Sequence, residues 1–391
     1  MRISLLTLLP ALVICVVIDL AIWWVMRRLS VGDKWRKADI TMMIISVLSV
    51  LIVVCVPKKM CGDTMLTVLT YVVFFIISQY LAKILALVAA VPLIWNRLRT
   101  TLLRWLPLAV GTLVFGSMWW GSFVTRFNID VHPEEVPIAS LPPSFDGYKI
   151  VQISDLHISS FGTDTTFVSE MVSRVNELHP DLIVFTGDIV TRKTDELPPF
   201  VSTLARLSAP DGVLAVKGNH DYGNYCEWPS ESAHQANNQQ LDSLFAAMRW
   251  RLLSNQTDTI RRGDDFITVT GVEYENMFAK QGTFTASLSE AIDVTAAKSA
   301  GCHILLYHSP EEWQPEIVPT GAFALTLSGH THAMQMEVFG LSPAALRYDC
   351  WAGLYRQGDS YLYVNRGIGT VGFPSRVGCN PEITLITLKT K

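Results

Sequence analysis

The chain has 391 residues, of which 50% are hydrophobic and 17% are charged. Its mean hydropathy of +0.30 is too high for an average soluble enzyme, and the excess lies before about residue 125, where apolar blocks alternate with short polar joints. The net charge is +9 up to and including Arg126 and −13 beyond it. A region this acidic excludes binding to a nucleic-acid backbone, which needs basic patches.

Residues 1–125 predict an all-α membrane domain, because about 20 consecutive apolar residues cross a bilayer. The first block leads directly into Arg27 and Arg28 without a small-residue cleavage site, which favours a retained anchor over a signal peptide. The four expected spans are residues 3–26, 40–57, 65–95 and 102–124.

Two charged residues fall inside these blocks. For Asp19 we expect a helix–helix hydrogen bond, with a proton relay as the alternative. The third block is longer than one untilted span, so we expect Lys83 near a membrane surface and the rest of the block along the interface. Lys and Arg number eight on the joints after the first and third blocks and four on the opposite side. Both termini and the acidic region are therefore expected outside the cytoplasm.

Residues 126–147 form a Pro-rich connector in which "FNIDV" suits an edge strand. Over residues 148–391, apolar runs typical of strands covered on both faces end abruptly in polar residues, and helical periodicity at 165–178 separates the first two runs. Ligands of such α/β sheets bind beyond the carboxyl ends of the strands, so we expect the endings to converge. The polar residues of the five endings are Asp155, His157, Asp188, Asn219, His220, Asp221, His308, His330 and His332.

These residues offer oxygen and nitrogen ligands without sulfur, a set that suits Mn, Fe or Zn. Their number exceeds the need of one ion and suits two. Alternation along a strand places Asp155 and His157 on the same side, and Asp188, alone at its strand end, is the expected bridging carboxylate. Any single ending is equally typical of a turn or a structural histidine. The five together predict a binuclear site, which suits displacement at phosphorus.

The motifs D-x-H (155–157), G-D (187–188), G-N-H-D (218–221), His308 and G-H-T-H (329–332) occur in this order. The set resembles the calcineurin-like metallophosphoesterase superfamily over about residues 148–391. The resemblance implies a four-layer α/β/β/α sandwich of two facing mixed sheets with helices outside. It also implies one ion held by Asp155, His157, Asp188 and His332, and a second held by Asp188, Asn219, His308 and His330.

By the same resemblance His220 is not a ligand: it protonates the leaving oxygen or neutralises transition-state charge, and we expect Asp221 to hold its ring. The segment 355–376 is similar to the closing region of a membrane-tethered bacterial branch, which is similar to enzymes cleaving phospholipid or UDP-diacylglucosamine-type substrates. Arg366 and Arg376 flank its Gly-rich loop and, with Arg192, are candidate phosphate contacts.

We therefore expect a binuclear phosphoesterase of the bacterial inner membrane with an extracytoplasmic catalytic domain. Its expected substrate is a phosphodiester or pyrophosphate bond of a lipid-linked or envelope compound. UDP-diacylglucosamine conflicts with that orientation, because nucleotide-linked precursors are made in the cytoplasm. The alternatives are a phosphomonoesterase acting on soluble periplasmic metabolites and a non-catalytic receptor or scaffold with a structural metal site. The cysteines beyond the membrane part form no C-x-x-C pair, and we expect buried thiols rather than disulfides at Cys226, Cys302, Cys350 and Cys379.

Overall fold

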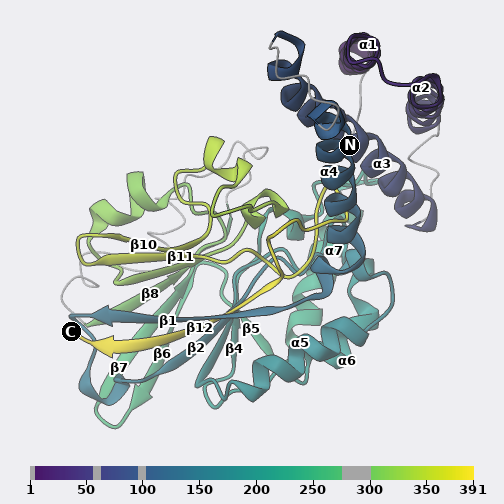
Figure 1. Cartoon of the computed structure of the whole chain (residues 1–391). Helices are drawn as coiled ribbons and strands as arrows, with labels where there is room; N and C mark the ends of the chain where they lie inside the picture. The colour runs from purple at the N-terminus through teal and green to yellow at the C-terminus, as the bar shows by residue number, and fades with distance from the viewer. Residues whose placement is uncertain (1–4, 56–62, 96–102, 275–300) are drawn as a thin grey trace. The chain divides into compact units, whose positions relative to one another are not determined.

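The computed structural model describes residues 5–55, 63–95, 103–274 and 301–391 (Figure 1). The chain divides into two compact units. One comprises residues 1–124 and 372–375, and the other comprises residues 125–371 and 376–391.

The first unit is helical, and each predicted span corresponds to one α-helix. Residues 3–4, 56–57 and 102 of these spans lie outside the described residues. Two segments, Met65–Leu93 and Leu103–Phe127, are long and apolar enough to cross a membrane. The helices are α1 (Leu5–Arg28), α2 (Asp33–Cys55), α3 (Asp63–Trp95) and α4 (Leu106–Phe123).

Polar side chains join the first three helices. The Tyr80 hydroxyl of α3 donates to Asp19 of α1 at 2.8 Å, which confirms the expected helix–helix hydrogen bond. The Lys83 ammonium lies 2.5 Å from the Asp19 carboxylate and 3.0 Å from the Asp39 carboxylate of α2. These ion pairs place Lys83 against the other helices of the unit, and its expected position near a membrane surface stays a prediction. Two carboxylates compensate the lysine inside the unit, and α3 is one helix of 33 residues.

A segment from near the C-terminus also belongs to the first unit. The Ser375 hydroxyl donates to the Met118 carbonyl of α4 at 2.7 Å, and the Phe373 ring lies parallel to that of Phe74 in α3, with centroids 6.2 Å apart. Residues 372–375 thus pack with the helices and not with the sheets.

Among the described residues, the second unit contains two six-stranded mixed sheets. The first has the order β1-β12-β2-β3-β4-β5, and the second has the order β10-β11-β9-β8-β7-β6. The strands of the first sheet are β1 (Asp130–Ile138), β2 (Lys149–Ile153), β3 (Leu182–Phe185), β4 (Val213–Ala215), β5 (Trp250–Leu252) and β12 (Glu382–Thr390). Those of the second are β6 (Gln256–Arg262), β7 (Asp265–Gly271), β8 (Cys302–Leu306), β9 (Leu325–Ser328), β10 (Gly353–Gln357) and β11 (Ser360–Val364).

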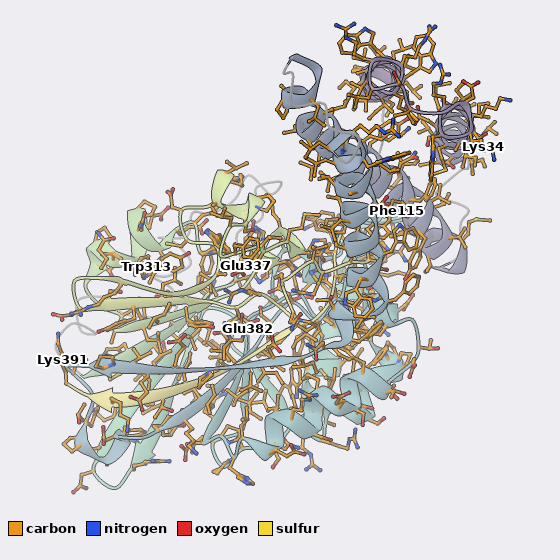
Figure 2. The ribbon with its side chains drawn as sticks, in the orientation of Figure 1. Lys34, Phe115, Trp313, Glu337, Glu382 and Lys391 are labelled. Atoms are coloured by element: carbon orange, nitrogen blue, oxygen red, sulfur yellow. The ribbon has the colours of Figure 1, made fainter. Side chains whose placement is uncertain are left out.

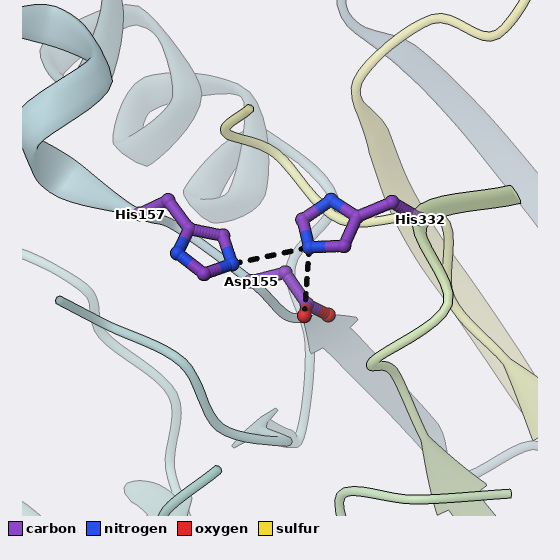
Figure 3. A group of neighbouring side chains, drawn as sticks. All are labelled: Asp155, His157 and His332. Atoms are coloured by element: carbon purple, nitrogen blue, oxygen red, sulfur yellow. Dashed lines mark hydrogen bonds and ion pairs between the residues drawn. The ribbon is translucent and has the colours of Figure 1, made fainter. Parts of the chain in front are cut away.

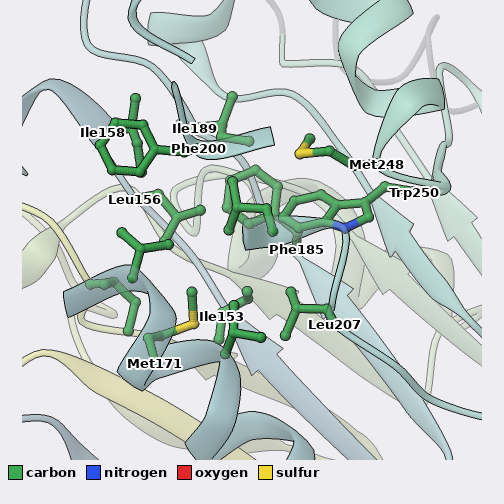
Figure 4. Packing of buried hydrophobic residues seen from close by; sticks show 14 of the residues in the cluster. Ile153, Leu156, Ile158, Met171, Phe185, Ile189, Phe200, Leu207, Met248 and Trp250 are labelled. Carbon is green, nitrogen blue, oxygen red and sulfur yellow. The ribbon is translucent and has the colours of Figure 1, made fainter. Parts of the chain in front are cut away.

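Both faces of the central strands β2, β3, β8 and β9 are buried, which explains the continuous apolar runs of the sequence. In β3, Leu182 and Val184 face the second sheet, whereas Ile183 and Phe185 pack under the helices. Figure 4 shows Phe185 beside Trp250 in this layer. The outer face of the second sheet packs against helical turns such as η9 (Trp313–Ile317). The expected four-layer sandwich is confirmed. The helices over the first sheet are α5 (Thr166–Glu177), α6 (Val201–Leu204) and α7 (Glu231–Ala247).

The predicted connector is part of this unit. Strand β1 pairs with β12 in parallel over its whole length and forms the edge of the first sheet. Pro133 and Pro137 are four residues apart, so both occupy positions whose missing N–H points away from β12. The prolines therefore permit the expected edge strand, which extends beyond "FNIDV" to Ile138.

Candidate metal centre

The polar endings of five strands meet at one site. Strands β2, β3 and β4 are parallel neighbours in the first sheet, and β8 and β9 are parallel neighbours in the second. Their carboxyl ends therefore lie together in each sheet. The structure brings together all seven predicted ligands, which are Asp155, His157, Asp188, Asn219, His308, His330 and His332.

Four of these residues form a first set. The Nε2 atom of His332 lies 3.1 Å from Nε2 of His157 and 3.2 Å from Oδ1 of Asp155 (Figure 3). Nε2 of His157 lies 3.5 Å from Oδ2 of Asp188. All four side chains are buried. Their donor atoms are close enough to share one cation.

The second set shares Asp188 with the first. Nε2 of His308 lies 3.3 Å from the same Oδ2 of Asp188 and 3.2 Å from Oδ1 of Asn219. Nδ1 of His330 lies 2.9 Å from that Asn219 oxygen and 3.2 Å from Nε2 of His308. The Asp188 carboxylate thus lies between two groups of donors, as a bridging ligand must.

The backbone supports the use of these residues as ligands. Asp155, His157, Asp188, His330 and His332 all have positive φ angles, between 38° and 74°. This conformation costs about 1–2 kcal/mol for a residue other than glycine, and such strain collects at functional sites. The strain turns carboxylates and imidazoles toward one another, an arrangement that divalent cations stabilise. The residues present therefore fit a pair of divalent cations.

Two motif glycines leave room for the ligands. A Cβ atom on Gly218 would lie 2.3 Å from Oδ1 of Asp188, and one on Gly329 would lie 2.2 Å from Oδ2 of Asp155. Neither carboxylate can move away without leaving its set. The glycines of G-N-H-D and G-H-T-H are thus steric requirements of the site.

Burial and neighbouring charges set the protonation of the donors. Burial lowers the pKa of His157 well below its usual value, and burial together with His308 lowers the pKa of His330 to about 3. Burial opposes a charge on His308, but the Asp188 carboxylate outweighs it and raises the pKa of His308 to about 9. Burial likewise opposes ionisation of Asp155 and Asp188, yet the surrounding imidazoles hold both pKa values below the usual range. The anionic carboxylates and the neutral imidazoles of His157 and His330 are thus in the forms that bind metal, whereas His308 must lose a proton to bind a cation.

His220 lies beside the first set, and a backbone carbonyl orients it. Its Nδ1 atom lies 2.6 Å from the Thr191 carbonyl oxygen, so Nδ1–H donates there. The ring stacks on Tyr225 at 4.0 Å and meets His157 edge-on at 4.8 Å. The expectation that Asp221 holds this ring is wrong. The Asp221 carboxylate instead accepts backbone N–H groups, at 2.8–3.2 Å, from Asp188, Ile189, Val190 and Gly218.

Arg376 does not bind substrate as predicted, because its side chain is fully buried. Its guanidinium donates to the carbonyls of Arg366, Gly367 and Gly369 at 2.6–3.0 Å and lies 3.4 Å from Nδ1 of His332. Arg376 therefore fixes the loop behind a candidate ligand.

The other two arginines differ in exposure. Arg366 bonds Glu337 and Glu382 at 2.9 and 2.8 Å, so its charge is already compensated, which argues against a phosphate contact. The two glutamates are labelled in Figure 2. Arg192 is partly exposed and lies 3.5 Å from Glu196. Arg192 follows Thr191, which orients His220, and a phosphate contact there stays a prediction.

Three tyrosines around the second set of donors were not predicted from the sequence. The Tyr225 hydroxyl accepts a hydrogen bond from Nδ2 of Asn219 at 2.7 Å, which turns the Asn219 oxygen toward the histidines. The rings of Tyr274 and Tyr348 lie 5.8 and 5.9 Å from that of His330. These tyrosines come from separate loops, so no spacing in the sequence identifies them.

Comparison with known proteins agrees with this geometry. Residues 148–334 match the family model described as calcineurin-like phosphoesterase. The chain is 30% identical to YkuE of Bacillus subtilis, an uncharacterized metallophosphoesterase, over 72% of this chain and 93% of that protein. It is 29% and 30% identical to proteins of Danio rerio and Bos taurus named transmembrane protein with metallophosphoesterase domain, over 65% of this chain in each case. The chain spans 56% of the length of these two vertebrate relatives.

Proposed function

This chain belongs to the calcineurin-like metallophosphoesterase family and is a metal-dependent phosphoester hydrolase, and we propose that it cleaves a phosphodiester or pyrophosphate bond of a lipid-linked or envelope substrate. The observation that carries the chemistry is the pair of donor sets joined at Asp188, with His220 beside them. The apolar helices of the first unit, together with relatives named as transmembrane proteins, support a substrate in or near a membrane. The excess of Lys and Arg on the first and third joints supports the bacterial inner membrane with the catalytic unit outside the cytoplasm.

The two donor sets would each hold one divalent cation, with Asp188 common to both. When bound, such a pair neutralises charge on phosphoryl oxygens and acidifies a water molecule. In the reaction, the oxygen of water forms a new bond to phosphorus while the bond from phosphorus to the leaving oxygen breaks.

His220 is placed to supply the proton that the leaving oxygen needs. Its Nδ1–H is committed to the Thr191 carbonyl, so Nε2 is the nitrogen that can transfer a proton. Stacking on Tyr225 keeps the ring in one plane. The proton lost by water passes to solvent, which balances the reaction.

A substrate panel tests this proposal. The purified full-length chain, loaded with Mn²⁺, is given bis(p-nitrophenyl) phosphate and p-nitrophenyl phosphate, with Asp188→Asn as the inactive control. We expect the diester to be cleaved with the higher kcat/KM. A preference for the monoester would indicate a phosphomonoesterase of soluble metabolites, and no hydrolysis of either would indicate a receptor or scaffold. Mass spectrometry of lipid extracts from cells with and without the protein would identify the substrate class.

A further inference from the structure

An apolar loop follows the last candidate ligand. We call residues 334–346 the apolar loop. Phe339 is fully exposed, and Leu341 and Leu346 are 76% and 93% exposed. Its other exposed hydrophobic residues are Met334 and Val338. Contiguous exposed apolar side chains on a folded protein mark an interaction surface.

The base of the loop is held firmly to the metal centre. Four consecutive residues, His332 to Gln335, have positive φ angles of 46–56°. The Ser342 hydroxyl donates to the Ala333 carbonyl at 2.7 Å, and Gln335 accepts the Val377 N–H at its carbonyl and the Val371 N–H at its side chain. The apolar loop is therefore a built feature, with a fixed connection to His332.

The tip of the loop is also ordered. Val338 and Leu341 exchange backbone hydrogen bonds of 2.9 and 3.0 Å around Phe339 and Gly340, both of which have positive φ. This turn presents the Phe339 ring to the outside, although water is an unfavourable environment for it. Residues 334–346 contain one charged side chain, Glu337, and Arg366 compensates it. No free charge in the loop opposes contact with an apolar medium.

The bilayer is the apolar medium within reach of this unit. The second apolar segment begins in the first unit and ends at Phe127, and β1 begins at Asp130. At no more than about 3.5 Å per residue, the chain enters the sheet within about 10 Å of the end of that segment. A tether this short keeps the unit at a high effective concentration relative to the lipid surface.

We propose that the apolar loop inserts into the outer part of the lipid bilayer and thereby holds the metal centre at the depth of lipid phosphate groups. The inference rests on the proposed function, because it makes a membrane lipid phosphoester the substrate. Interfacial insertion of Phe and Leu side chains is a common means of membrane attachment. Met334, at the base of the loop, is two residues from His332, so the inserted side chains and a candidate ligand belong to one short segment.

Photocrosslinking tests the contact directly. The photoreactive phenylalanine analogue p-benzoylphenylalanine replaces Phe339 in the full-length chain, which is reconstituted in vesicles of phosphatidylethanolamine and phosphatidylglycerol. The control carries the analogue at Asp359, on the exposed β10–β11 turn. We expect lipid adducts at position 339 and none at 359. Crosslinks to a second copy, crosslinks within the chain, or no adduct at 339 would each overturn the proposal.

Kinetics separate this inference from the proposed function. In Phe339→Ser/Leu341→Ser, the KM for a fluorescent phospholipid embedded in vesicles should rise about tenfold, since two inserted side chains are lost. Cleavage of soluble bis(p-nitrophenyl) phosphate should not change, and Val131→Ser, an exposed residue of β1, should affect neither substrate. An equal loss on both substrates would mean that the loop only supports the fold. No wild-type cleavage of the soluble diester would instead refute the proposed function and leave the crosslinking result standing.

Discussion

Replacing Arg376 tests whether this arginine holds the loop behind His332. Its guanidinium donates to the carbonyls of Arg366, Gly367, Gly369 and Cys379. The Gly367 carbonyl also accepts the Glu382 N–H at 3.1 Å, so it keeps a donor when Arg376 is replaced. We therefore count the loss of a donor at the other three carbonyls. A buried acceptor that loses its donor costs about 1–3 kcal/mol, which gives about 3–9 kcal/mol for Arg376→Met. That is a large part of the roughly 5–15 kcal/mol that stabilises a domain.

The assay is chemical unfolding of the full-length chain in detergent, followed by tryptophan fluorescence. Arg376→Met should lose at least about 3 kcal/mol. Arg376→Lys should lose less, since an ammonium still donates. Arg356→Met, an exposed arginine of β10, is the matched control and should change the free energy of unfolding by less than about 0.5 kcal/mol. Unchanged stability of Arg376→Met combined with a raised KM would refute the reasoning and restore a phosphate contact.

Three further predictions concern the metal centre. His220→Ala should retain both ions in elemental analysis and lose about 10²–10⁴ in kcat, most for poor leaving groups; unchanged turnover would remove His220 from the mechanism. A cation at His308 must displace a proton, because the pKa there is raised to about 9, so metal affinity should fall about tenfold per pH unit below that value. Calorimetry in buffers of different ionisation enthalpy should show proton release on metal binding at pH 7. The absence of proton release would contradict a raised pKa at His308. Tyr225→Phe removes the acceptor of the Asn219 amide and should weaken one of two calorimetric metal sites about fivefold; equal weakening of both would contradict a role at Asn219 alone.

The features that local sequence determines were predicted well. An apolar run that ends in Asp, Asn or His is recognisable without its neighbours, and the carboxyl ends of parallel strands must meet at one edge. Hence the α/β class and the gathering of the ligand residues followed from these patterns, whereas the four-layer arrangement was implied by the resemblance to the calcineurin-like superfamily. Cys302, Cys350 and Cys379 are buried free thiols, as expected, and Cys226 is a free thiol that is only partly buried.

The features that depend on a partner distant in the sequence were not predicted. Arg376 is enclosed by carbonyls, and Asp221 accepts N–H groups from the turn after β3; neither partner is encoded by a side-chain type. The carbonyl that orients His220 belongs to Thr191, where any residue would supply it. The ion pair of Lys83 with Asp39 was not predicted, because Asp39 lies on another helix. Backbone partners and long-range ion pairs leave no local pattern.

The number of cations bound per chain tests the central claim most directly. The chelated full-length protein is titrated with Mn²⁺, and bound metal is measured by elemental analysis after removal of free ions. Two ions should bind the wild-type chain, and Asp188→Asn should weaken both, since the Asp188 carboxylate lies between the two donor sets at 3.5 and 3.3 Å from their histidines. A single ion in the wild type, or two ions held as tightly by Asp188→Asn, would contradict the shared carboxylate and with it the proposed site.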